Sequence, residues 1–363
     1  MKKAVCMFLT AALAVSCLAG CGGNAAGNTS TGNASAGTDS SATDGSVFKI
    51  GSIGPTTGDA AIYGNAVMNA AQMAVDEINA AGGANGYQLA FKAEDDQNDA
   101  EKSVNAYNSL KDWGMQVLMG TVTSAPCVAV ADKTNADNMF QITPSGSSVE
   151  CAQNPNVFRV CFSDPDQGAA SATYIAENKL AEKIAVIYDS SDVYSSGIYE
   201  KFAAEAANQG LEIVDAEAFT ADSNKDFSTQ LQKAKDAGAD LVFLPIYYTE
   251  ASLILKQADT MGYAPKFFGC DGMDGILQVE NFDTKLAEGL MLLTPFAADA
   301  QDELTQKFVT SYKENYGETP IQFAADAYDV IYSMYQAVLE TGITGDMDAS
   351  EICEQLKTAY TSM

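Results

Sequence analysis

Strand-like and helix-like apolar segments alternate along most of the chain. The segment 48–53 has the character of a buried strand, and 64–80 then places its apolar residues at helical spacing along one face. Gly82 and Gly83 end that helix, and 88–93 alternates apolar and polar residues as the next strand. This repeated order of strand and helix predicts a parallel sheet with helices on both of its faces.

The alternation runs twice along the chain, with a break at 163–165. Before the break the expected elements are strand 48–53, helix 64–80, strand 88–93, helix 100–112, strand 117–119, helix 125–135 and strand 139–142. After the break they are helix 167–178, strand 183–188, helix 196–209, strand 212–218, helix 227–237, strand 241–244, helix 251–261 and strand 266–268. We therefore expect an α/β fold with two lobes, each built on a doubly wound parallel sheet.

Two further helices, 303–316 and 323–340, exceed what a second lobe of ordinary size needs, so we expect them to return to the first lobe. The expected division is lobe I from 47–164 plus 295–345, and lobe II from 165–294 plus 346–363. Because the chain then crosses between the lobes several times, the crossings should form a hinge that closes the lobes around a ligand in the cleft between them.

The N-terminus has the pattern of a secretory signal peptide. Lys2 and Lys3 precede an apolar stretch, and 1–20 is expected to be absent from the mature protein. The sequence Leu18-Ala19-Gly20-Cys21 resembles the lipobox of bacterial lipoproteins, in which the cysteine is acylated after cleavage; an ordinary cleavage site or a membrane anchor is the alternative. The segment 21–46 is rich in Gly, Ala, Ser, Thr, Asn and Asp, so it is expected to be a flexible linker after the lipidated Cys21.

Composition excludes several classes of function. The formal net charge of −28 leaves no basic face for a nucleic acid. The sequence has no histidine, which removes Ser-His and Cys-His nucleophile pairs and histidine metal sites. Arg159 is the only arginine, so a ligand carboxylate would have to be held by hydroxyls, backbone amides or lysine. We expect neither a cofactor nor a metal, and an enzyme only if it acts through carboxylates, Lys, Tyr or Cys.

The cysteines that remain after removal of 1–20 show none of the short CxxC spacing of zinc or redox sites. They are Cys21, Cys127, Cys151, Cys161, Cys270 and Cys353. Cys151 and Cys161 lie close in sequence, and they are either a disulfide formed outside the cell or buried free thiols. The sequence leaves both possibilities open.

A series of short motifs from residue 47 onward resembles one family. The motifs are, in order, Ile50-Gly51-Ser52-Ile53-Gly54-Pro55, Thr57-Gly58, Tyr63-Gly64, Asp76-Glu77-Ile78-Asn79, Gly82-Gly83, Asp95-Asp96, Gln141-Ile142-Thr143-Pro144-Ser145, Val157-Phe158-Arg159, Asp164-Pro165-Asp166-Gln167-Gly168 and Asp226-Phe227. Together they resemble type I periplasmic binding proteins of the leucine/isoleucine/valine-binding group. The resemblance implies capture of an amino acid without chemical reaction, and its delivery to an ABC permease by a monomer on the outer face of the membrane. Members of this group usually continue past 349–359 into further strands of lobe II, whereas this chain stops at Met363; a truncated lobe II and a natural end both stay open.

The residues expected to hold the carboxylate of the ligand lie after two strands of the first lobe. Ser124 follows 117–119 and opens a helix, where hydroxyls and free backbone amides attract an anion; a plain helix cap is the alternative. The resemblance makes Ser124 a ligand-binding serine, and it implies that the backbone of Ser145, Gly146 and Ser147 contacts the amino and carboxylate groups of the ligand.

The residues expected to hold the rest of the ligand come from both lobes. Asp271 stands just beyond the C-terminal end of strand 266–268, where open α/β sheets bind ligands, and its carboxylate suits an ammonium group. A helix cap or a solvated loop carboxylate is the alternative. Tyr63, Tyr194 and Tyr247 match positions at which the family walls its pocket with aromatic rings, and ordinary core packing is the alternative for each.

Two acidic features of the sequence are not assigned to the ligand-binding site or to a metal site. The run 94–99 lacks the spacing of a calcium loop, so we expect a solvated strand end. Asp326 and Asp329 lie in an apolar helix; Asp326 either faces the cleft or, as is commoner, lies on the helix surface. The expected function is therefore binding of an aliphatic or branched-chain amino acid for import, with ligand sensing for a membrane receptor or a carboxylate-dependent hydrolase as alternatives.

Overall fold

The computed structural model describes residues 47–362. The expected signal peptide, the lipidated Cys21 and the linker 21–46 lie outside these residues. Within 47–362, no helix combines the length and the apolar character needed to cross a membrane.

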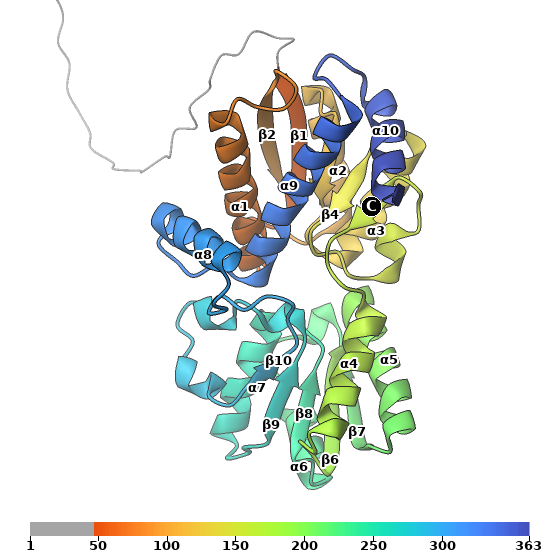
Figure 1. Ribbon diagram of the computed structural model, residues 1–363. Helices are drawn as coiled ribbons and strands as arrows, with labels where there is room; N and C mark the ends of the chain where they lie inside the picture. Colours follow the sequence, from red (N-terminus) through yellow and green to blue (C-terminus); the bar gives the residue numbers. More distant parts are fainter. Residues whose placement is uncertain (1–46, 363) are drawn as a thin grey trace, which may run out of the picture. The chain divides into compact units, whose positions relative to one another are not determined.

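The first lobe is built on a five-stranded parallel sheet with the order β2-β1-β3-β4-β5. Its strands are β1 (Val47–Gly54), β2 (Gln88–Asp95), β3 (Val117–Gly120), β4 (Gln141–Thr143) and β5 (Val157–Arg159). The helices that connect them are α1 (Ala61–Ala80), α2 (Ala100–Trp113) and α3 (Ser124–Ala136), followed by the short 3₁₀ helix η1 (Val149–Ala152). Because helices cover both faces, the central strand β3 is buried along its whole length, as parallel strands usually are (Figure 1).

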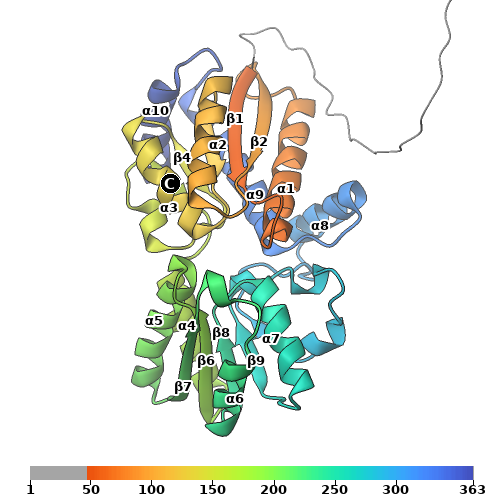
Figure 2. The ribbon, with the colours of Figure 1, turned by 180° about the vertical axis from the view of Figure 1, so that it is seen from behind.

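The second lobe repeats this plan with the strand order β10-β9-β8-β6-β7, again all parallel. Its strands are β6 (Lys183–Asp189), β7 (Glu212–Phe219), β8 (Leu241–Leu244), β9 (Lys266–Gly269) and β10 (Met291–Leu292). Its helices are α4 (Asp164–Glu177), α5 (Val193–Gln209), α6 (Ser228–Asp236) and α7 (Tyr248–Thr260), with the 3₁₀ helices η2 (Ala221–Ser223), η3 (Asp271–Met273), η4 (Ile276–Gln278) and η5 (Thr284–Ala287). Figure 2 shows the two sheets from behind, each with its own helices. The predicted pair of doubly wound parallel sheets is confirmed.

After β10 the chain returns to the first lobe through α8 (Glu303–Tyr316) and α9 (Gln322–Thr341). The Tyr316 hydroxyl at the end of α8 donates a hydrogen bond of 2.6 Å to the carbonyl of Asn69 in α1. The side chain of Asn85 donates to the carbonyl of Val338 in α9 over 2.9 Å. Val330 of α9 is fully buried among the apolar residues of the first lobe.

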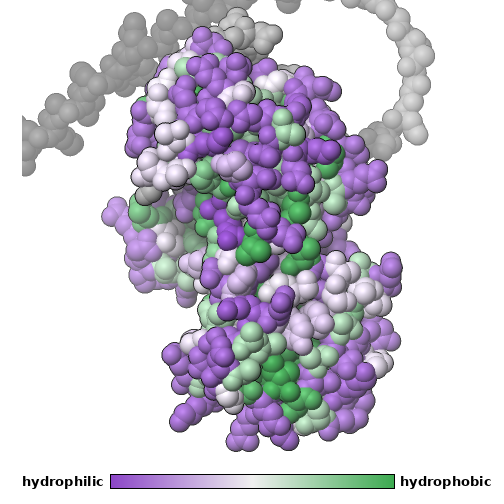
Figure 3. All heavy atoms as spheres, turned by 90° about the vertical axis from the view of Figure 1, so that its right-hand side faces the viewer, coloured by the Kyte–Doolittle hydropathy of each residue, from purple (hydrophilic) through white to green (hydrophobic). Residues whose placement is uncertain are grey.

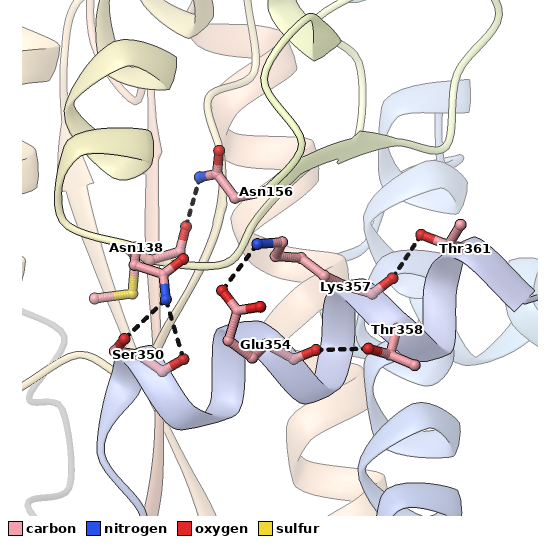
Figure 4. Close-up of polar contacts among 8 residues, drawn as sticks. Asn138, Asn156, Ser350, Glu354, Lys357, Thr358 and Thr361 are labelled. Carbon is pink, nitrogen blue, oxygen red and sulfur yellow. Dashed lines mark hydrogen bonds and ion pairs between the residues drawn. The ribbon is translucent and has the colours of Figure 1, made fainter.

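The last helix, α10 (Ala349–Ser362), packs on the first lobe, so the assignment of 346–363 to lobe II was wrong. The ring of Tyr360 lies 5.1 Å from that of Phe140 and 5.2 Å from that of Phe158, between centroids. At the start of the helix, the amide of Asn138 donates to the hydroxyl of Ser350 over 2.8 Å, as Figure 4 shows. The apolar face of α10 is thus buried beside β4 and β5, which gives it a hydrophobic reason to dock there.

The surface of the described residues is largely polar. Figure 3 shows one face, on which hydrophilic side chains predominate and apolar ones form separate patches. The exposed large apolar side chains are scattered over several elements: Val149, Val160, Tyr174, Leu277, Leu304 and Leu339. Scattered exposure of this kind is ordinary for a protein surface.

Candidate ligand-binding site

The strand ends of both lobes contribute to one small chamber. Its lining residues are Tyr63, Val122, Thr123, Ser124, Ser145, Tyr194, Tyr247, Asp271, Gly272 and Phe323. Six of the eight residues expected from the sequence are among them: Tyr63, Ser124, Ser145, Tyr194, Tyr247 and Asp271. The free space in the chamber is about 10 Å³, about what one water molecule needs. A larger molecule therefore requires the walls to move apart.

On the side of the first lobe, the chamber is bounded by the N-terminus of α3 and the loop after β4. The Ser124 hydroxyl accepts a hydrogen bond from the backbone N–H of Ser148 over 3.2 Å. Thr123, and not Ser124, stands at the N-cap position, and its buried hydroxyl has no hydrogen-bond partner among the described residues. The Ser145 hydroxyl donates to the carbonyl of Val122 over 2.6 Å. Hydroxyls and a helix N-terminus thus meet at one wall, which favours an anionic group there.

Two of the expected residues lie behind this wall and not in it. Gly146 donates its N–H to the hydroxyl of Thr143 over 2.7 Å, and a side chain at Gly146 would press against Cys127. Ser147 is buried, and its carbonyl accepts a hydrogen bond from the Arg159 guanidinium over 2.9 Å. Both residues therefore fix the loop that presents Ser145 and, in this structure, do not line the chamber themselves.

On the side of the second lobe, the chamber ends at the carboxyl of Asp271, which is 1% exposed. The Tyr194 hydroxyl donates to Asp271 Oδ1 over 2.7 Å, and the Gln322 amide lies 3.5 Å from Oδ2. Burial raises the pKa of Asp271 to about 6, although the hydrogen bond from Tyr194 favours the ionised form. The solvated-loop interpretation of Asp271 is excluded by its burial. A buried carboxylate of this kind is a strong acceptor for a cation.

Aromatic rings close the remaining sides. Tyr194 and Tyr247 stack with their ring centroids 4.9 Å apart, and Tyr63 lies 4.4 Å from Phe323 and 5.6 Å from Tyr247. The Tyr63 hydroxyl donates to the carbonyl of Gly272, so the ring of a first-lobe residue is bonded to a second-lobe loop. These tyrosines line the chamber, and Tyr63 and Tyr194 also belong to the hydrophobic cores, so core packing and a place in the chamber wall hold together.

Further polar contacts join the lobes beside the chamber. The backbone N–H of Ile62 donates to the Tyr248 hydroxyl over 3.1 Å, and the Thr249 hydroxyl donates to the carbonyl of Asp59 over 2.7 Å. The Lys225 ammonium and the Asp59 carboxylate form an exposed ion pair at 3.1 Å. A wider pocket of about 400 Å³ lies outside the chamber, and Tyr247 is a wall of both.

Two buried carboxyl groups near the chamber are absent from the ligand-binding residues expected from the sequence. Asp164 is 1% exposed, and burial raises its pKa to about 8, although the nearby Ser147 hydroxyl favours the ionised form. Asp326 is 7% exposed, and burial followed by repulsion from Asp271 raises its pKa well above the usual range. The commoner outcome expected for Asp326, a helix surface, was therefore wrong. One signal was available: Asp326 interrupts the apolar face of its helix.

One residue of the acidic run 94–99 is buried, although the whole run was expected to be a solvated strand end. Asp96 is fully buried, its Oδ1 accepts from the N–H of Asn98 over 2.9 Å, and burial raises its pKa to about 7. The neighbouring Asp95 instead caps a loop, because its Oδ1 accepts from the N–H of Thr56 over 2.8 Å. Only part of the run is a solvated strand end. No cluster of three or more Asp, Glu or Cys side chains within 47–362 is arranged to hold a metal ion.

Comparison with known proteins assigns the class. The sequence profile of the periplasmic binding protein family matches residues 47–361, and the chain belongs to this family. The leucine-, isoleucine-, valine-, threonine-, and alanine-binding protein of Pseudomonas aeruginosa is 29% identical over 313 residues, which cover 85% of this chain and 82% of that protein. Leu/Ile/Val-binding protein homolog 3 of Brucella melitensis is 32% identical over 226 residues, which cover 62% of this chain and 61% of that protein.

Among solved structures, the chain is similar to the branched-chain amino acid transporter substrate binding protein LivJ of Streptococcus pneumoniae, crystallised in complex with isoleucine. The TM-score is 0.78 at 29% identity, and the match covers 85% of this chain and 87% of that one. The resemblance drawn from the motifs is thereby confirmed. The relatives named here are solute-binding proteins and not enzymes, so the hydrolase alternative has no support from them.

Proposed function

We propose that this protein is the extracellular solute-binding component of an ABC importer, and that it binds an aliphatic or branched-chain amino acid in the chamber between its lobes. The observation that carries the proposal is the placement of two opposite partners across one chamber. A helix N-terminus with the hydroxyls of Ser124 and Ser145 stands on one side, and the buried carboxyl of Asp271 stands on the other.

A zwitterion satisfies both partners at once. Its carboxylate accepts hydrogen bonds from the hydroxyls and from backbone amides at the start of α3, and its ammonium donates to Asp271. An apolar side chain then lies against the rings of Tyr63, Tyr247 and Phe323. Each buried methylene adds about 0.8 kcal/mol, so the fit to these rings sets the preference among aliphatic amino acids.

Ligand exchange requires the lobes to separate, because the free space of about 10 Å³ is far smaller than an amino acid. The contacts that must break include the hydrogen bonds of Tyr63 to Gly272, Ile62 to Tyr248 and Thr249 to Asp59. The ring contacts of Tyr63 with Tyr247 and Tyr248 must also separate. The segments 160–163 and 293–296 connect the lobes, and the backbone bends within each. Hinge closure of this kind desolvates the two charged ends of the ligand and strengthens their contacts.

The cellular setting belongs to the same proposal. Acylated Cys21 anchors the protein to the outer face of the membrane, and the linker lets the lobes, acting as a monomer, reach the ABC permease. Relatives named for leucine, isoleucine and valine support an amino acid as the cargo. A binding protein that reports to a membrane receptor would use the same chamber. Deletion of the permease distinguishes the two roles, because growth on the amino acid is lost if the protein serves import and persists if it serves sensing.

A panel of amino acids tests the ligand class. Thermal unfolding is measured with each amino acid in turn, and ligands that bind only the folded state raise the midpoint. We expect leucine, isoleucine or valine to raise it most, and the ligand to be recovered unchanged after denaturation. A panel in which no amino acid shifts the midpoint would contradict the proposal.

A further inference from the structure

Cys151 interacts most strongly with Cys127, and not with its sequence neighbour Cys161. Cys127 in α3 and Cys151 in η1 are both fully buried free thiols. The two side chains lie close enough that each has the largest influence on the pKa of the other. Cys161, the sequence neighbour of Cys151, is also buried, but it influences the pKa of Cys151 less than Cys127 does.

The surroundings hold the two sulfurs in place. The Cys151 sulfur also lies 3.6 Å from the carbonyl oxygen of Ser124, one helical turn before Cys127. The Gln141 amide lies 3.5 Å from the Cys127 sulfur. Gly146 packs closely against the same sulfur, because a Cβ added there would come within 3.1 Å of it.

We propose that Cys127 and Cys151 form a disulfide bond in the exported protein, and that this bond ties η1 and the loop after β4 to the N-terminus of α3. The inference rests on the extracellular location in the proposed function, because disulfides persist in oxidising compartments. The two joined segments carry Ser124 and Ser145, the residues proposed to hold the ligand carboxylate. Both segments belong to the first lobe, so the bond leaves the movement between the lobes unhindered.

The reaction is exchange with a small-molecule disulfide such as oxidised glutathione, and it takes place during folding, before the sulfurs are buried. The Cys127 thiolate attacks one sulfur of the oxidant and releases the first glutathione thiolate. The Cys151 thiolate then attacks Cys127 in the mixed disulfide and releases the second. The cysteine pair loses two electrons and two protons, and the oxidant is reduced to two thiols.

Peptide mapping tests the pairing directly, because trypsin separates the three cysteines. Cleavage after Lys111, Lys133, Arg159 and Lys179 places Cys127 in 112–133, Cys151 in 134–159 and Cys161 in 160–179. The chain is unfolded, refolded with a mixture of oxidised and reduced glutathione, alkylated and digested. We expect 112–133 linked to 134–159, lighter than the two reduced peptides by two hydrogen atoms. Recovery of both peptides alkylated, or of 134–159 linked to 160–179, would overturn the proposal.

Stability gives a second readout. A disulfide that closes a loop of about 25 residues should raise the unfolding midpoint by roughly 5–10 °C relative to protein refolded under reducing conditions. This difference should persist in Cys353→Ala, which removes a buried thiol elsewhere, and should vanish in Cys127→Ala and Cys151→Ala. Amino-acid binding is measured on the same samples. A linked protein that binds no amino acid would count against the proposed function alone, and an unlinked protein that binds one would count against the disulfide alone.

Discussion

The hydroxyl of Tyr194 bridges the carboxylate of Asp271 and the backbone that follows it. It donates to Asp271 Oδ1 over 2.7 Å and accepts from the N–H of Gly272 over 2.9 Å. This pair of hydrogen bonds fixes the carboxylate in the chamber, where burial would otherwise favour its neutral form.

Asp271→Asn should weaken amino-acid binding strongly. The substitution keeps the shape of the side chain but leaves the buried ammonium of the ligand without a charged partner, which costs about 3–5 kcal/mol, or roughly 10²–10³-fold or more in affinity. Isothermal titration calorimetry with the best ligand of the panel measures the loss. Asp236→Asn, which alters an exposed carboxylate at the end of α6, is the matched control and should bind as the unaltered protein does. Unchanged affinity in Asp271→Asn would place the ammonium elsewhere.

Tyr194→Phe should change the pH dependence of binding as well as its strength. Binding requires an ionised Asp271, so affinity is present above the pKa of about 6 and is lost as the pH falls through it. Removing the hydroxyl removes a hydrogen bond that favours the ionised form, so the loss of affinity should begin at a higher pH. Titrations across a pH series measure the shift, with Tyr199→Phe of the same helix as the control. An unshifted profile would show that the hydroxyl does not tune this carboxylate.

Much of this architecture is predictable from the chain, and the exceptions have physical causes. Buried parallel strands read as continuous apolar runs, which is why β3 and β8 are predictable. The three-residue β5 and two-residue β10 are too short to carry such a signal. An amphipathic pattern in α10 indicates which face is buried, but it does not say against which sheet.

The residues of the candidate site also include some that the sequence predicts and some that it does not. Asp271 and Ser124 follow strands, and the topology of open α/β sheets brings such positions to a common edge. Asp96 and Asp164 stand among polar residues, which predicts a solvated carboxylate, whereas Asp326 stands in an apolar helix. Their burial arises from packing between segments far apart in the sequence, which no local pattern records.

The buried carboxyl of Asp164 should make the protein less stable as the pH rises. Its pKa is about 8 in the folded protein and about 4 in the unfolded chain, so between these values the folded state holds a proton that the unfolded chain has lost. The free energy of unfolding therefore falls from about pH 4 to about pH 8. Asp164→Asn should flatten this fall and raise stability near pH 8 by about 1–3 kcal/mol, measured by urea unfolding at several pH values. A slope as steep as that of the unaltered protein would contradict the assignment.

Lipid anchoring is tested in cells that export the protein. Metabolic labelling with a fatty acid should mark the mature protein, which should sediment with membranes. Cys21→Ala should abolish both the label and the sedimentation, whereas Cys353→Ala should abolish neither. An unlabelled wild-type protein would show that Cys21 is not acylated.

The central claim is that a zwitterionic amino acid lies between Asp271 and the start of α3, and three related titrations test it most directly. Leucine supplies both charged ends, leucine methyl ester lacks the carboxylate, and 4-methylpentanoate lacks the ammonium. The account predicts that leucine binds with one molecule per chain, and that each analogue binds at least roughly 10²-fold more weakly, because each leaves one buried partner unmatched. Equal binding of leucine and either analogue, or no binding of leucine, isoleucine or valine, would contradict it.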